Sequence, residues 1–257
     1  MIASRRPVAL VTGARRGIGA AIARALAAAG FDVAITDLVA DDDARSALDG
    51  IAAAGGKALF IENDLAELGG HRLAIEEVAA KLGPIDCLVN NAGIGSPARG
   101  DLLEMRPAAF DEVLGVNLRG TFFFSQAVAR HMLATASVHR RTIVIVSSVS
   151  AELASPERGE YCMSKAGLAM MARLLALRLA PRGVGVFEVR PGVIRTPMTA
   201  AVADGYDRRI GEGLVPMNRW GEPHDVADAV AALASGRFAF ATGSVIHLDG
   251  GLAIPRL

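Results

Sequence analysis

The chain has few of the side chains that build disulfide frameworks or metal sites. It contains only two cysteines, Cys87 and Cys162, which lie too far apart to form a metal-binding pattern. Cys87 sits in an apolar run, which predicts a reduced residue of the core. The five histidines, at 71, 131, 139, 224 and 247, also lack ligand spacing. We therefore predict no catalytic metal.

An excess of charge and a long apolar segment are absent as well. Lys plus Arg and Asp plus Glu each number 27 among 257 residues, so no basic excess points to a nucleic-acid partner. No apolar run approaches membrane-spanning length, and the first run, at 8–11, is too short for the core of a signal peptide. We expect a cytoplasmic protein without a membrane partner.

The sequence instead alternates short β-branched runs with longer segments rich in Ala and Leu. We expect strands at 8–11, 32–36, 57–61, 87–89, 142–146, 184–189 and 244–248, and helices at 17–29, 45–54, 70–82, 107–135, 160–180 and 224–234. Helical crossovers between strands predict an α/β fold, a doubly wound seven-stranded parallel sheet in a single domain over 1–257. Two stretches look irregular: 136–141, expected to be a solvated loop, and 197–216. The second follows the sixth strand, beside the ligand crevice of such sheets, so we expect a substrate lid.

A glycine-rich loop follows the first strand, in Thr12-Gly13-Ala14-Arg15-Arg16-Gly17-Ile18-Gly19. Its glycines permit a tight turn and a close approach of backbone to a diphosphate at the helix N-terminus. Asp37 ends the second strand, where a carboxylate accepts hydrogen bonds from ribose hydroxyls and repels a 2′-phosphate. Arg15 and Arg16 favour a 2′-phosphate. We give Asp37 more weight and predict NAD rather than NADP, although a plain turn residue is the alternative for Asp37.

Tyr161 and Lys165 are four residues apart in a predicted helix, so they share one face. An ammonium beside a phenol stabilises the phenolate and makes the tyrosine a better acid or base near neutral pH. Such a pair alone is more often an ordinary surface pair. Ser148, thirteen residues earlier at the end of a strand, and the glycine loop favour a catalytic interpretation.

With these motifs the chain resembles the short-chain dehydrogenase/reductase family over nearly its whole length. It is most similar to the 3-oxoacyl-acyl-carrier-protein reductase branch and to related sugar and polyol dehydrogenases. The resemblance implies a Rossmann-type fold and hydride transfer between a nicotinamide cofactor and a secondary alcohol or ketone. It implies the catalytic residues Asn117, Ser148, Tyr161 and Lys165. The implied cofactor-binding residues are Gly13, Arg15, Arg16, Gly17, Ile18, Gly19, Asp37, Asp64, Leu65, Asn91, Ala92, Gly93, Tyr161, Lys165, Pro191, Gly192, Ile194 and Thr196.

The resemblance implies that Tyr161 is the general acid or base and that Lys165 also holds the nicotinamide ribose. Ser148 would stabilise the substrate oxygen, and Asn117 would hold a water that links Lys165 to solvent. Each has a structural alternative: Ser148 can cap a turn, Asn117 can bond nearby backbone, and Thr196 can precede a proline turn. A non-catalytic dinucleotide sensor on the same fold is the rival function, although such a protein would be expected to lose these residues. An epimerase or dehydratase would be expected to have a larger C-terminal region.

The substrate is less well specified. The residues expected to line the pocket are Ile94, Ser150, Glu152, Leu153, Glu157, Val193 and Met198. Glu152 and Glu157 could bind the hydroxyls of a sugar or polyol, or be solvated loop charges. An acyl carrier protein would need a basic patch, for which Arg99, Arg106, Arg119, Arg130, Arg140 and Arg141 are available, but Asp37 departs from the NADPH-preferring reductases of fatty acid synthesis. Two helices, 107–135 and 160–180, are apolar around most of their surface, so we predict a homotetramer packed through them.

Overall fold

One sheet of seven parallel strands organises the molecule. The computed structural model describes residues 5–256, and its strand order is β3-β2-β1-β4-β5-β6-β7. The strands are β1 (Val8–Thr12), β2 (Asp32–Asp37), β3 (Ala58–Glu62), β4 (Ile85–Asn90), β5 (Arg141–Val146), β6 (Val184–Pro191) and β7 (Val245–Leu248). This confirms the predicted fold class. The strand order reverses between β1 and β4, and such a switch point is where doubly wound sheets bind ligands at the carboxyl edge.

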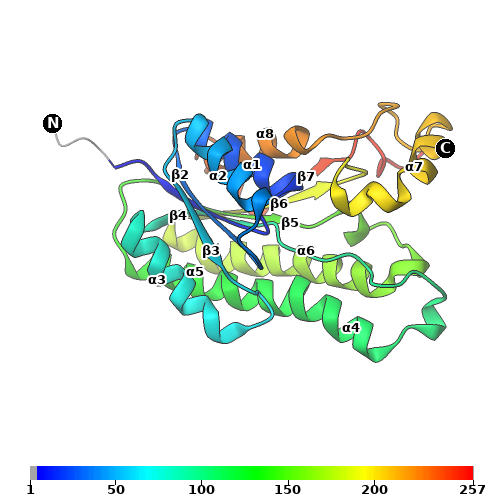
Figure 1. The fold of residues 1–257 in the computed structure, drawn as a ribbon, viewed down its shortest axis with the longest axis horizontal. Helices are drawn as coiled ribbons and strands as arrows, with labels where there is room; N and C mark the ends of the chain where they lie inside the picture. Colours follow the sequence, from blue (N-terminus) through cyan, green and yellow to red (C-terminus); the bar gives the residue numbers. More distant parts are fainter. Residues whose placement is uncertain (1–4, 257) are drawn as a thin grey trace.

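Helices cover both faces of the sheet, as Figure 1 shows. On one face lie α1 (Gly17–Ala28), α2 (Asp42–Ala53) and α8 (Pro223–Ala234); on the other lie α3 (His71–Lys81), α4 (Pro107–Leu114), α5 (Thr121–Ala134) and α6 (Gly159–Leu179). Two apolar clusters fill the spaces between these layers. Within β1, Ala9 and Val11 belong to one cluster, and Val8 and Leu10 to the other. Alternate residues of a strand point to opposite faces, so a strand covered on both sides is apolar throughout.

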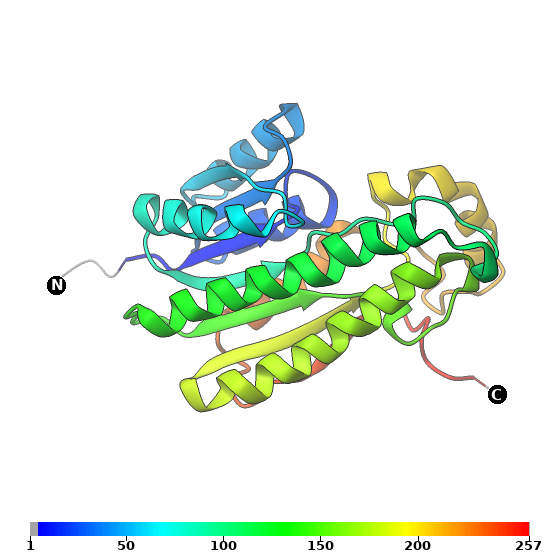
Figure 2. The ribbon, with the colours of Figure 1, turned by 90° about the horizontal axis from the view of Figure 1, so that it is seen from below.

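Most helices match their predicted bounds to within one residue, and two differ further for local reasons. α2 begins three residues before the predicted start, because the Asp41 carboxylate accepts a hydrogen bond from Ala44 N (3.1 Å) and caps the helix. The predicted helix 107–135 is one continuous rod (Figure 2), but its middle turn, Gly115–Gly120, is a π-helix between α4 and α5.

The stretch 197–216 was predicted to be irregular, and this is wrong. It contains a 3₁₀ helix at Pro197–Val202 and helix α7 (Ala203–Gly211). Thr196 caps the first of these, and Pro197 fits the first helical position, where no N–H is needed. α7 packs on a small apolar cluster of its own, formed by Ile210, Val215 and Trp220.

Three further findings concern the sequence predictions. The part of the N-terminus at residues 1–4 lies outside the described residues, so the expected absence of a leader is not tested there. Within 5–256, no helix combines the length and apolar character needed to cross a bilayer. Cys87 is 1% exposed in the core, and its burial raises the pKa of the thiol to about 12, as expected for a reduced core residue.

Candidate active site

The glycine loop closes on β4 at the carboxyl edge of the sheet. The Thr12 hydroxyl accepts hydrogen bonds from Asn91 N and Ala92 N, both 3.1 Å, and Asn91 Nδ2 donates to Gly13 O at 2.8 Å. A Cβ at Gly13 would stand 2.6 Å from Ala92 Cα, and one at Gly19 would stand 2.4 Å from Gly13 O. Side chains are therefore excluded, and the backbone at the start of α1 remains open for a phosphate group. This cradle fits a dinucleotide.

Asp37 holds the loop from the end of β2. Its carboxylate accepts a hydrogen bond from Arg15 N at 3.3 Å, and Arg15 Nε lies 3.5 Å from the other oxygen. The Arg15 guanidinium also pairs with Asp41, while Arg16 lies 3.7 Å from Asp43. Both arginines that could meet a 2′-phosphate therefore already face carboxylates.

Tyr161 and Lys165 occupy the first two turns of α6, beside the end of β5. Lys165 Nζ lies 5.5 Å from the centroid of the Tyr161 ring and donates to Val146 O at 3.3 Å. Lys165 is 4% exposed. Ser148 follows β5 and its hydroxyl accepts a hydrogen bond from Ser150 N (3.1 Å), so it does cap a turn. That bond uses an acceptor lone pair and leaves the O–H free to donate.

Asn117 lies in the π-helical turn and is fully buried. Its Oδ1 accepts from Ile94 N at 2.8 Å, and its Nδ2 donates to Ile94 O at 3.0 Å and to Ser164 Oγ at 3.1 Å. A Cβ at Gly93 would stand 3.1 Å from Asn117 Oδ1 and 3.6 Å from Lys165 Nζ. The asparagine, Gly93 and the lysine therefore meet at one point, while a water between Asn117 and Lys165 stays a prediction.

The segment after β6 faces the glycine loop. Gly192 N donates to Leu248 O at 3.0 Å, and Ile194, 3% exposed, forms a bridge to Gly221. A Cβ at Gly17 would stand 3.9 Å from the Thr196 side chain. Thr196 and Thr199 form a reciprocal capping box at the start of the 3₁₀ helix. The structural alternative for Thr196, a turn before Pro197, is therefore confirmed.

Asp64 and Leu65, also among the implied cofactor-binding residues, follow β3 at the same edge of the sheet. Asp64 Oδ1 accepts a hydrogen bond from Ala66 N at 2.8 Å, and Leu65 is 4% exposed. The remaining predicted cofactor residues, Ile18 and Pro191, lie in the first turn of α1 and at the end of β6. The structure therefore places all the predicted site residues along one edge of the sheet.

A buried ion pair beneath this edge was missed by the sequence predictions. Glu188 and Arg190 are 1% and 2% exposed, and Arg190 Nε lies 2.6 Å from Glu188 Oε1. Ser147 Oγ donates to Glu188 at 2.6 Å, and Arg190 also pairs with Glu152. Burial alone would lower the Arg190 pKa, but the hydrogen bonds to both glutamates outweigh it and raise that pKa. The spacing of two charges inside an apolar strand was the available signal.

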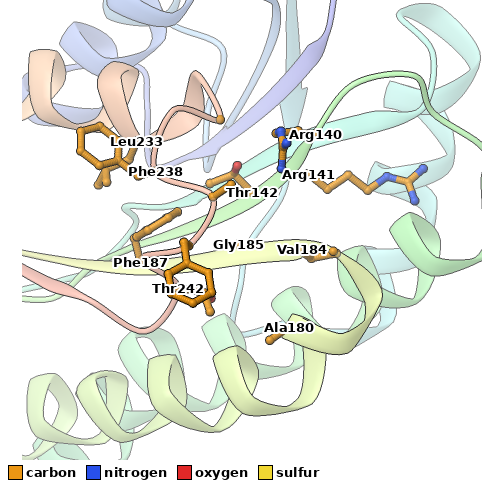
Figure 3. A pocket seen from close by; sticks show the side chains of 14 residues that line it. Arg140, Arg141, Thr142, Ala180, Val184, Gly185, Phe187, Leu233, Phe238 and Thr242 are labelled. Atoms are coloured by element: carbon orange, nitrogen blue, oxygen red, sulfur yellow. The ribbon is translucent and has the colours of Figure 1, made fainter.

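Glu152, for which both hydroxyl binding and a solvated loop charge were considered, instead pairs with Arg190, although half of its side chain stays exposed. It borders a cavity of about 1010 Å³ at the carboxyl ends of β6 and β7. A smaller cavity of about 290 Å³ lies at the opposite edge, between the starts of β5 and β6 (Figure 3). Arg140, Arg141, Phe238 and other residues line it. This cavity lies at the amino ends of the parallel strands, whereas the predicted site lies at their carboxyl ends, so the two are far apart.

The comparisons with known proteins agree with this arrangement. Residues 13–253 match the profile of a family described as Enoyl-(Acyl carrier protein) reductase. A 3-oxoacyl-[acyl-carrier-protein] reductase of Staphylococcus epidermidis is 36% identical over 244 residues, which cover 95% of this chain and 98% of the relative.

Two solved structures are also similar. A 3-oxoacyl-[acyl-carrier protein] reductase from Brucella melitensis in complex with NAD is 55% identical, with a TM-score of 0.96 over 99% of this chain and 100% of that chain. A putative 2-deoxy-D-gluconate 3-dehydrogenase from Agrobacterium tumefaciens with bound NADP is 34% identical, with a TM-score of 0.87 over 98% of both chains. The chain therefore belongs to the short-chain dehydrogenase/reductase family and is an oxidoreductase that uses a nicotinamide cofactor on alcohol or carbonyl groups.

Proposed function

We propose that Tyr161 exchanges the proton with the substrate oxygen, as general acid in reduction and general base in oxidation. The observation that carries this proposal is the position of Lys165, buried 5.5 Å from the centroid of the Tyr161 ring, beside the Ser148 loop. A bound nicotinamide supplies or accepts the hydride at the carbonyl carbon. The Ser148 hydroxyl, free to donate, hydrogen-bonds the substrate oxygen and stabilises its negative charge.

Lys165 favours the phenolate of Tyr161 by its charge and holds the nicotinamide ribose hydroxyls. Asn117 supports this lysine from the π-helical turn and binds the water through which the proton reaches solvent. The glycine loop and the 191–196 segment orient the cofactor from two sides. The lid, 197–216, closes over the substrate and excludes water.

Tyr161→Phe tests this assignment. Loss of one general acid lowers turnover by about 10²- to 10⁴-fold, while NADH binding, followed by fluorescence, stays unchanged. Lys165→Met should reduce both turnover and cofactor affinity. Lys57→Met, at an exposed position before β3, is the matched control for Lys165→Met and should retain turnover and cofactor affinity. A Tyr161→Phe enzyme with a near-normal rate would overturn the assignment.

We infer a preference for NAD over NADP from the Asp37 carboxylate at the end of β2. A 2′-phosphate placed there meets a like charge, and the nearby Arg15 is already paired with Asp37 and Asp41. Asp37→Ala removes the repulsion and one of the two carboxylates that pair with Arg15, so the NADP/NAD ratio of kcat/KM should rise by about 10- to 100-fold. A wild-type enzyme that prefers NADP would contradict the inference.

For the substrate we propose a carbonyl compound with the 3-oxoacyl thioester as first candidate, supported by the names of the relatives. Acyl carrier protein is then a partner, with Arg99 and Arg106, both exposed in the segment between β4 and α4, available as a basic docking surface. A sugar or polyol is the second candidate, supported by the Agrobacterium tumefaciens neighbour. Initial rates with NAD and NADP against 3-oxoacyl esters, sugars and polyols separate the two.

We propose a homotetramer assembled through α5 and α6, which lie side by side in Figures 1 and 2. α6 buries one apolar face and exposes another. The exposed side chains are Met163, Met170, Leu174 and Leu177, at 45%, 51%, 56% and 78% exposure. Their spacing places them in one stripe along the helix. Leu174→Glu with Leu177→Glu should give a smaller species in light scattering, and an unchanged mass would count against this interface.

A further inference from the structure

A second cation lies against Tyr161. Arg158, the residue directly before α6, places its guanidinium carbon 5.2 Å from the centroid of the Tyr161 ring. Its Nη2 donates to Ser150 Oγ at 3.2 Å, and its Nε donates to Ser155 Oγ at 3.4 Å. Both serines belong to the loop that follows Ser148. The arginine is therefore held against the Tyr161 ring by the loop that follows Ser148.

Among residues 5–256, the charge of Arg158 has no carboxylate counterpart. Within the described part of the chain, no carboxylate oxygen lies within the 4.0 Å that defines an ion pair for this arginine. The nearest carboxylates along the chain have other surroundings. Glu152 pairs with Arg190, Glu160 is buried with the Ser96 hydroxyl, and Glu157 is exposed.

Three other buried or partly buried arginines do face carboxylates, whereas Arg141 spends its donors on Met132 O and on Thr135. Arg15 faces Asp37 and Asp41, Arg190 faces two glutamates, and Arg5 lies 2.9 Å from Asp86. A guanidinium has five N–H donors, and Arg158 uses two of them on protein acceptors. Three donors and a full positive charge remain available beside the tyrosine. A planar carboxylate matches that fork with two parallel hydrogen bonds.

We propose that Arg158 binds a carboxylate of the substrate, so that the enzyme acts on short hydroxy or oxo acids whose charged group lies near the reacting carbon. This rests on the proposed role of Tyr161, because the arginine selects substrates only if chemistry occurs at that residue. Of the substrates considered above, this favours sugar acids over neutral polyols, and it counts against a neutral 3-oxoacyl thioester. It also turns the serines at 150 and 155 into positioning residues that aim the guanidinium.

A binding experiment tests the site without knowledge of the natural substrate. The enzyme–NADH complex is titrated with malonate and with malonamide, its neutral analogue, and NADH fluorescence is followed. Malonate should bind more tightly than malonamide. Arg158→Gln should weaken malonate by about 10- to 100-fold and leave NADH and malonamide binding unchanged. Arg158→Lys should keep part of the malonate affinity, because it retains a point charge without the fork.

Arg237→Gln, an exposed arginine far along the chain, is the matched control and should bind malonate like the wild type. Equal binding of malonate and malonamide to the wild type overturns the proposal, as does full malonate binding by Arg158→Gln. Failure of the wild-type enzyme to bind NADH would instead show that the proposed function is wrong, and the carboxylate site proposed here would then be wrong as well.

Turnover gives an independent readout. Rates with NADH are compared for 3-oxobutanoate and its ethyl ester, and rates with NAD for D-gluconate and D-glucitol. In whichever pair is turned over, Arg158→Gln should lower kcat/KM for the acid by about 10- to 100-fold, mainly through KM, and leave the neutral analogue unchanged. Equal losses for both members of a pair would mean that Arg158 only supports Tyr161, and would overturn the proposal.

Discussion

Removing the Glu188 carboxylate should be among the most destabilising single changes in this protein. Arg190 is the largest fully buried side chain, and Glu188 provides two of its hydrogen bonds, at 2.6 and 3.2 Å. Glu188→Ala leaves the guanidinium in the core with only the half-exposed Glu152 as a counterion. Breaking a buried pair in this way costs about 3–5 kcal/mol, a large part of the roughly 5–15 kcal/mol that holds a domain folded.

Urea denaturation followed by circular dichroism measures this free energy of unfolding. Glu152→Ala, which removes the exposed partner, is the matched control and should cost about 0–1 kcal/mol. The double variant Glu188→Leu with Arg190→Met removes both charges and should recover most of the lost stability. A Glu188→Ala protein within about 1 kcal/mol of wild type, or a double variant no better than the single one, would refute this account of the pair.

Two further predictions follow from packing and burial. Gly19→Ala should abolish NADH binding, because the new Cβ would stand 2.4 Å from Gly13 O. Gly50→Ala inside α2 is the control: its Cβ would stand 3.7 Å from the Arg24 side chain, and it should stabilise the fold by about 0.5–1 kcal/mol. Equal NADH affinities of the two variants in fluorescence titrations would contradict the proposed role of the glycine loop. Burial lowers the pKa of His71 below its usual 6.5, so the unfolded state binds more protons below about pH 6.5 and stability should fall as the pH drops from about 7.5 to about 5.5. His71→Gln should reduce that slope in urea denaturation, and an unchanged slope would rule out His71 as its source.

Hydropathy period and turn residues were sufficient to predict the layers of this fold, because a sheet covered on both faces requires strands that are apolar throughout. The site motifs were also readable, since glycines and a Tyr-x-x-x-Lys pair stand at fixed places relative to predicted strands and helices. Charges that find partners only in three dimensions were not readable. Arg15 was considered for a 2′-phosphate, and Glu152 for substrate hydroxyls or as a solvated loop charge, yet each meets a side chain from another element. Arg158 escaped notice because its significance lies in having no carboxylate partner among the residues that the structure describes.

The helices of 197–216 were missed because their period is short and interrupted by Gly205, Gly211 and Gly213. Their order depends on a tertiary contact that spacing does not encode. The indole N–H of Trp220 donates to Asp207 at 2.5 Å, and the Tyr206 ring meets the indole edge-on with centroids 5.7 Å apart. The spacing of apolar residues predicts helices that pack against the main core, but not helices that pack against a cluster as small as Ile210, Val215 and Trp220.

The π-helical turn between α4 and α5 amounts to one residue more than a regular helix would hold. Deleting a single residue there, such as Gly115, would restore a continuous hydrogen-bond ladder, but it would rotate everything upstream by about 100° around the helix axis. Ala109 and Val113, which are buried in this structure, would turn toward water, and α4 would lose its packing against α6. This deletion would therefore give a more regular helix but a less active enzyme. The additional residue sets the rotation of α4 relative to α5, and the packing of α4 depends on it.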